Sequence, residues 1–317
     1  MKAIRDISNI LVMGTGMMGP GIALSLARGG FQVSLYGRNA ASLERGQAHL
    51  ERIAGNLVEF ELATPDAIRG ALERIALTAD LADAAGRADM IVESVVEEID
   101  VKQQVFAELC TLCAADTILA TNTSGISITR IAGPVTHPER FVGTHFWNPP
   151  YLMPLVEVVK GDATSDATLE TVCQVIERAG KKAVRVLKDI EGFLGNRLQH
   201  ALWREALALV DMGVASPADI DAMIKYSFAL RMPPIGVFEY MDMVGIDLVQ
   251  NCHSYLFAAL DRRTSPSPVT TALLEAGHLG AKSSQGFFDW TPEKLAERIR
   301  ERDREVVRQL RLAQDGE

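Results

Sequence analysis

The stretch "LVMGTGMMGPGIALSLARGG" (residues 11–30) decides the fold, because it places a glycine-rich turn between an apolar run and a helical pattern. Gly14 allows the tight turn, Gly16 lets backbone approach a pyrophosphate, and Gly19 lets helix and sheet close up, with Met17 and Met18 between them. Free N–H groups at the start of the helix also attract phosphates. The glycine pattern alone also occurs in ordinary turns, but its strand and helix context predicts dinucleotide binding.

The length and composition predict two domains of an ordinary globular protein. The chain has 317 residues, of which 48% are hydrophobic and 23% charged. A formal net charge of −9 argues against nucleic-acid binding, which usually requires a basic face. No apolar run is long enough to span a bilayer, and the N-terminus lacks the pattern of a signal peptide. We therefore expect a cytoplasmic protein with no membrane or nucleic-acid partner.

The cysteines predict no metal site. Cys110 and Cys113 form a C-x-x-C pair on an expected helix, but a second pair of ligands is absent. Ordinary reduced thiols are the simpler interpretation, consistent with a reducing compartment.

The first 190 residues alternate between strand-like and helix-like segments. The expected strands are 9–13, 32–36, 75–78, 90–94, 117–121, 141–145, 155–159 and 183–187, and helical patterns between them include 17–29, 40–60 and 100–114. This alternation predicts an α/β fold with a Rossmann-type, doubly wound, mostly parallel sheet. The connection between the strands at 141–145 and 155–159 is too short for a parallel crossover, so we expect that pair to be antiparallel.

The pattern changes after "KDIEGFLGN" (188–196), because helical segments follow without a convincing strand. These segments are 197–212, 217–226, 245–260, 268–276 and an amphipathic one at 291–312. We therefore expect a dinucleotide-binding domain over 1–189 and an all-α domain for substrate binding and dimerisation over 190–317.

The end of the second expected strand bears on the choice of cofactor. A site that prefers NAD usually carries Asp or Glu there, to accept hydrogen bonds from the ribose hydroxyls. This chain has Gly37 followed by Arg38, so a 2′-phosphate is not repelled and Arg38 could hold it. The alternative is that Arg38 is a solvated loop residue and that NAD binds without its usual anchor. We favour NADP over NAD.

Four polar side chains lie at the ends of two expected strands, on the next strand, and at the start of the helical region. "TNTSGISI" supplies Ser124, "GTHFWNPP" supplies His145, "LVEVV" supplies Glu157, and "GFLGNRL" supplies Asn196. Each alone has a structural explanation, such as a helix cap or a satisfied histidine. Together, beside a nucleotide site, they predict oxidation of an alcohol: an imidazole removes the O–H proton, a carboxylate fixes its tautomer, and donors stabilise the oxygen.

The sequence resembles the 3-hydroxyacyl-CoA dehydrogenase family along essentially its whole length, from "GTGMMGPGIA" through "IVESVVEEIDVKQQVFAEL" to "SSQGFFDW". The resemblance implies that His145 is the general base and Glu157 its orienting partner, with Ser124 and Asn196 positioning the substrate oxygen. It also implies a homodimer. The residues that fall where the family contacts the nicotinamide nucleoside are Glu97, Lys102 and Asn122.

Several stretches depart from typical acyl-CoA enzymes. "NPPYLMPLVEVV" and "ALRMPPIG" are similar to the branch that contains L-gulonate 3-dehydrogenase (lambda-crystallin) and other dehydrogenases of small carboxylates. Arg231 is then a candidate clamp for a free substrate carboxylate, although it could equally be a surface arginine. "VFEYMDMVGIDL" stays close to the general family, so a CoA thioester remains the alternative to a small free 3-hydroxy acid.

Two further functions stand as alternatives. A crystallin-like structural protein, or a nucleotide-binding protein without turnover, would be favoured by loss of His145, Glu157 or Asn196, and all three are present. A decarboxylating 3-hydroxyacid dehydrogenase of the other β-hydroxyacid superfamily would need a catalytic lysine near the hinge, and none lies at the matching place.

Overall fold

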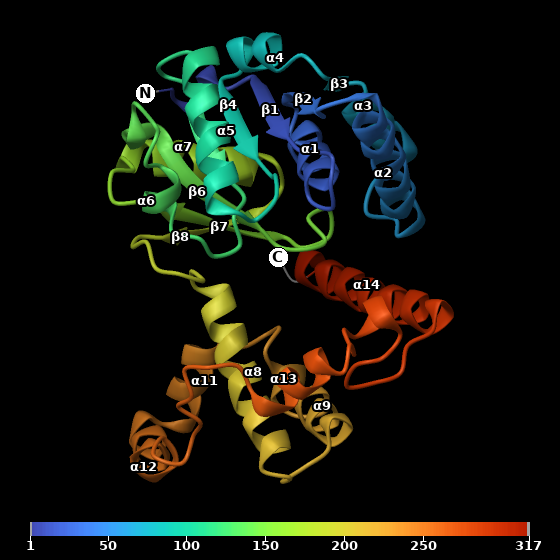
Figure 1. Cartoon of the computed structure of the whole chain (residues 1–317), viewed down its shortest axis with the longest axis vertical. Helices are drawn as coiled ribbons and strands as arrows, with labels where there is room; N and C mark the ends of the chain where they lie inside the picture. The colour runs from blue at the N-terminus through green and yellow to red at the C-terminus, as the bar shows by residue number, and fades with distance from the viewer. Residues whose placement is uncertain (1, 316–317) are drawn as a thin grey trace. The chain divides into compact units, whose positions relative to one another are not determined.

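The computed structural model describes residues 2–315, with side chains as far as Leu312. The chain forms two compact units, Met1–Asn196 and Arg197–Glu317, which are described one at a time (Figure 1). Within the described residues, none of the helices is both long enough and apolar enough to cross a membrane.

The first unit contains one sheet with strand order β3-β2-β1-β4-β5-β6-β7-β8. Its strands are β1 (Asn9–Met13), β2 (Gln32–Tyr36), β3 (Ile75–Thr78), β4 (Met90–Glu93), β5 (Ile118–Thr121), β6 (Phe141–Phe146), β7 (Leu155–Lys160) and β8 (Lys182–Val186). Neighbouring strands are parallel except β6 and β7, which are antiparallel. The predicted Rossmann-type sheet and its one tight antiparallel connection are confirmed.

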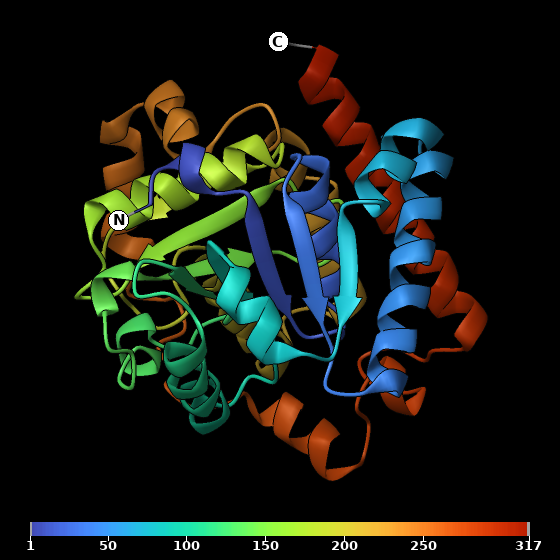
Figure 2. The ribbon, with the colours of Figure 1, turned by 90° about the horizontal axis from the view of Figure 1, so that it is seen from above.

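Helices cover both faces of this sheet, as Figure 2 shows. Alternate residues of each buried strand enter different cores: Ile10 and Val12 face one, and Leu11 and Met13 face the other. The first core contains α1 (Gly19–Arg28), α2 (Ala40–Glu59), α3 (Pro65–Leu72) and α7 (Asp166–Arg178). The second contains α4 (Leu81–Arg87), α5 (Ile99–Leu112) and α6 (Ile128–Ile131). Burial on both faces explains why the central strands are continuous apolar runs.

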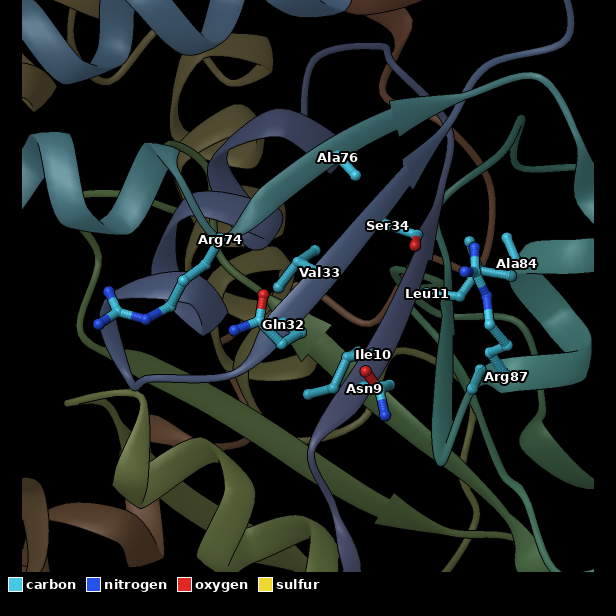
Figure 3. Close-up of a pocket in the computed structure, with 11 residues that line it drawn as sticks. Asn9, Ile10, Leu11, Gln32, Val33, Ser34, Arg74, Ala76, Ala84 and Arg87 are labelled. Carbon is cyan, nitrogen blue, oxygen red and sulfur yellow. The ribbon is translucent and has the colours of Figure 1, made fainter.

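The carboxyl ends of the parallel strands bring distant loops to one edge of the sheet. The strand order reverses between β1 and β4, and ligands bind outside the carboxyl ends at such a point. A cavity drawn in Figure 3 lies at the other edge, because Asn9 and Gln32 begin β1 and β2 and Arg74 precedes β3. This cavity is therefore separate from the expected cofactor site.

The second unit is helical, as predicted, and only two isolated β-bridges occur in its described residues. Its helices are α8 (Gly195–Asp211, which begins in the first unit), α9 (Pro217–Lys225), α10 (Phe228–Arg231), α11 (Val237–Val244), α12 (Ile246–Leu256), α13 (Pro268–Glu275) and α14 (Pro292–Asp315). Asp211, at the end of α8, accepts hydrogen bonds from Ser267 Oγ and Val269 N, so α8 holds the start of α13. Helix α9 starts with Ser216 as its N-cap, which accepts from Asp219 N, and with Pro217 at its first position.

Candidate active site

The glycine turn between β1 and α1 has the geometry of a phosphate cradle. Gly14 has φ +109°, and a Cβ there would lie 2.3 Å from Ser94 O. A Cβ on Gly19 would overlap the Gly14 carbonyl, whereas one on Gly16 would meet nothing within 4 Å. The open space at Gly16 and the uncapped N-terminus of α1 therefore fit a pyrophosphate. Of the methionines in the turn, Met17 is exposed and Met18 packs on the core.

At the end of β2, the usual acidic side chain would have to displace neighbouring side chains. Gly37 is buried, and a Cβ there would lie 2.6 Å from Ser42 Oγ and 2.8 Å from Leu43 Cδ2. Asn39 caps α2 by accepting from Ser42 N, which fixes this packing. Arg38 is exposed, so its guanidinium is available to a ligand at this edge.

His145 and Glu157 are directly paired residues of the β6–β7 hairpin. His145 Nδ1 lies 2.7 Å from Glu157 Oε2, and both side chains are buried. Glu157 Oε1 accepts hydrogen bonds from Leu194 N at 2.9 Å and Gly195 N at 3.0 Å. The carboxylate thus holds the imidazole and the start of α8 together.

The electrostatics of this pair keep the carboxylate ionised. Burial alone would raise the pKa of Glu157, but hydrogen bonds from His145, Gly195 N and Leu194 N outweigh it and lower the pKa. An ionised Glu157 accepts a hydrogen bond from the Nδ1–H of His145, which leaves the lone pair on Nε2 to accept a proton from a substrate.

Ser124 and Asn196 lie against each other at the same edge. Asn196 Nδ2 donates to the Ser124 carbonyl oxygen, and Ser124 N donates to Glu97 Oε1 at 2.7 Å. Ser124 is exposed, so its hydroxyl is accessible to a substrate oxygen. The backbone of this loop is therefore fixed while the side chain of Ser124 remains available.

Asn122 and Lys102 are buried and have protein partners. Asn122 Oδ1 accepts from Phe146 N at 2.9 Å, which ties the end of β5 to the end of β6. Lys102 is 1% exposed, with Nζ 2.8 Å from Glu93 Oε1 and 3.2 Å from Glu97 Oε2. The carboxylate of Glu93 was not singled out from sequence; its only signal was an acidic residue at the end of an apolar strand.

Arg231, the candidate carboxylate clamp, lies at the end of α10 in the helical unit. It is exposed, and its guanidinium stacks over the Tyr240 ring at 3.8 Å. A guanidinium held by stacking keeps N–H groups free to bind an anion.

A metal centre is not found in the part of the chain that the structure describes, where no group of three or more His, Cys, Asp or Glu could hold an ion. The cysteines are free thiols. The candidate site of the first unit thus consists of a phosphate cradle, a base held by a carboxylate, and hydrogen-bond donors for a substrate oxygen.

Comparison with known proteins matches both units to one family. The 3-hydroxyacyl-CoA dehydrogenase NAD binding domain matches residues 9–190, and the 3-hydroxyacyl-CoA dehydrogenase C-terminal domain matches residues 192–290. The 5-formyl-3-hydroxy-2-methylpyridine 4-carboxylate 5-dehydrogenase of Mesorhizobium japonicum is 37% identical, over 98% of this chain and 100% of its own length. A 3-hydroxybutyryl-CoA dehydrogenase of Bradyrhizobium diazoefficiens is also 37% identical, over 91% of this chain and 97% of its own.

A solved structure gives the same relationship in three dimensions. The crystal structure of a 5-formyl-3-hydroxy-2-methylpyridine 4-carboxylic acid 5-dehydrogenase, described as an NAD+-dependent dismutase, matches with a TM-score of 0.90 and 37% identity. The match covers 96% of this chain and 98% of that one.

Proposed function

The chain belongs to the 3-hydroxyacyl-CoA dehydrogenase family and is an NAD(P)-dependent dehydrogenase, and from this premise we propose that it oxidises the 3-hydroxy group of a small free 3-hydroxy acid. The reverse reaction reduces the 3-oxo acid. The observation that carries the proposal is the His145–Glu157 pair, buried at the edge of the sheet where the phosphate cradle also lies.

His145 and Glu157 handle the proton in this mechanism. Nε2 of His145 takes the hydroxyl proton as the C–H bond breaks, and Glu157 stabilises the imidazolium that forms. Ser124 donates to the oxygen as it gains alkoxide character, and Asn196 fixes the backbone that carries Ser124. A bound nicotinamide cofactor would supply the hydride acceptor. In reduction, the imidazolium returns the proton to the oxygen.

A free carboxylate substrate is supported by the extent of the similarity. The match to the family's C-terminal domain ends at residue 290, before α14. The pyridine carboxylate dehydrogenase is similar along 98% of the chain, so its similarity extends beyond that point. Arg231 offers a guanidinium for the carboxylate of such a substrate. The alternative is a 3-hydroxyacyl-CoA thioester, which is supported by the equal 37% identity to a 3-hydroxybutyryl-CoA dehydrogenase.

NADP is the preferred cofactor in this proposal. Because residue 37 is glycine, it brings no carboxylate to oppose a 2′-phosphate, and the neighbouring Arg38 is exposed to pair with one.

The helical unit is proposed to bind substrate and to form a homodimer. Residues 1–189 then bind the cofactor, and 190–317 bind substrate and the second copy. Large apolar side chains on this unit are exposed in the single chain, including Trp203, Tyr226, Phe238, Tyr255 and Phe257. Exposed apolar side chains mark an interaction surface where they lie together in a patch. The free thiols support a cytoplasmic location.

Initial rates with NADH and NADPH test the proposal, measured against a panel of free 3-oxo acids and against acetoacetyl-CoA. We expect turnover of at least one free acid, faster with NADPH. Turnover of acetoacetyl-CoA alone, and with NADH, would refute both the proposed substrate class and the proposed cofactor preference. Light scattering during gel filtration tests the dimer, and a monomer at micromolar concentration would contradict it.

A further inference from the structure

A closed network of charges joins β4, α5 and the loop after β5. Glu93, the last residue of β4, is fully buried. Its Oε1 accepts from Val95 N at 2.6 Å and Lys102 Nζ at 2.8 Å, and its Oε2 accepts from Thr121 Oγ1 at 2.6 Å. A carboxylate buried this deeply is costly unless it is paired and fully hydrogen-bonded, and here it is both.

Lys102 carries the network from Glu93 to Glu97. Its ammonium lies between the two carboxylates, 2.8 Å from Glu93 Oε1 and 3.2 Å from Glu97 Oε2. Glu97 Oε1 accepts from Thr123 Oγ1 at 2.6 Å and Ser124 N at 2.7 Å. The network therefore begins at Thr121 and ends at Ser124, and both residues lie on one short segment of the chain.

The network carries a surplus of one negative charge. Two carboxylates share a single ammonium, and only Glu97 reaches solvent, with 43% of its side chain exposed. Glu97 contacts the loop of Ser124, beside which the reacting carbon must lie if His145 and Ser124 hold its oxygen. A nicotinamide ring would have to approach that same carbon to accept a hydride, which would bring it close to the surplus charge.

The two redox states of the cofactor differ in the charge of the nicotinamide ring. The oxidised nicotinamide is positive and the reduced one is neutral, so a nearby negative charge favours the oxidised form. Resting on the proposed function, we propose that Glu93 is a positioning residue that, through Lys102, sets the charge facing the nicotinamide and so tunes the relative affinity for oxidised and reduced cofactor.

Binding measurements on single and double variants test this inference. Glu93→Gln removes the surplus charge and should raise the ratio of Kd for oxidised cofactor to Kd for reduced cofactor by roughly tenfold. Lys102→Met removes the only ammonium of the network and, measured at alkaline pH so that Glu93 stays ionised without it, should lower that ratio. The double variant leaves Glu97 as the only charge, so its ratio should return close to that of the unaltered protein, although both affinities fall.

Asp89→Asn is the matched control, because it neutralises a carboxylate about 13 Å away at the other end of β4. Its ratio should equal that of the unaltered protein. Equal changes in both affinities, or none, in Glu93→Gln and Lys102→Met would overturn the inference alone. If Glu93→Gln does not fold, Lys102→Met alone decides by the same ratio. Failure of the unaltered protein to bind either form would overturn the proposed function and the inference with it.

Discussion

Replacing Glu157 by glutamine should abolish most of the activity while leaving the fold intact. Glu157 Oε1 already accepts from Leu194 N and Gly195 N, at 2.9 and 3.0 Å. The glutamine oxygen must take that position, because its amino group would face two donors. The amino group is then turned toward His145 Nδ1, where the carboxylate oxygen lies 2.7 Å away in the native chain.

That arrangement reverses the tautomer of the histidine. With a donor opposite Nδ1, the proton of the neutral imidazole moves to Nε2, which can no longer accept a proton from the substrate. Loss of base catalysis costs about 10²- to 10⁴-fold in kcat, and a tautomer trapped in the wrong form costs up to about 10⁴-fold. A thousandfold loss corresponds to about 4 kcal/mol of activation free energy.

The assay is kcat and KM at pH 7, together with cofactor affinity and chemical unfolding. We expect kcat to fall by about 10³-fold, cofactor Kd to change less than threefold, and the unfolding free energy to fall by about 1–3 kcal/mol. Asp89→Asn is a matched control, since Asp89 also accepts from two backbone N–H groups, those of Ser8 and Asn9. A kcat within threefold of the unaltered enzyme, in a folded Glu157→Gln protein, would refute the assigned base.

Four further predictions follow from single positions. Gly16→Val should raise cofactor Kd at least a hundredfold without lowering the Tm of the cofactor-free protein, because the side chain fills open space; equal affinity by titration would refute the cradle. Arg38→Ala should raise Kd for NADPH about tenfold and leave NADH unchanged. Arg231→Ala should raise KM for free 3-oxo acids about tenfold and spare acetoacetyl-CoA. Burial, aided by the charge of Arg28, lowers the pKa of Lys181 to about 8; because the unfolded chain then binds more protons, stability should rise with pH between about 8 and 10, and Lys181→Met should flatten that slope in urea titrations.

The pairing of His145 with Glu157 could be foreseen because it depends on local geometry. A tight connection between two apolar strands forces an antiparallel hairpin, and residues directly opposite each other share a face. The strand bounds were also close, since buried parallel strands are short apolar runs with clear ends.

The network around Glu93 could not be foreseen in the same way. Its partners come from β5 and α5, so the pairing of Glu93 with Thr121 depends on which strands are neighbours in the sheet. Lys102 matched a cofactor-contact position by resemblance, yet its ammonium lies between two carboxylates. Sequence alone does not show whether a charge at a helix start faces solvent or a buried partner.

The two oxygens of Glu157 bear on how related sequences should be interpreted. Oε1 holds the first turn of α8 whether or not a substrate is ever turned over. A related protein without enzymatic activity would still be destabilised by replacement of this carboxylate. Glutamate can therefore be retained at this position after the activity is lost. His145 has no comparable structural task among its hydrogen bonds, since its described bond is to Glu157 itself. Among relatives, the histidine is therefore the better marker of a working enzyme.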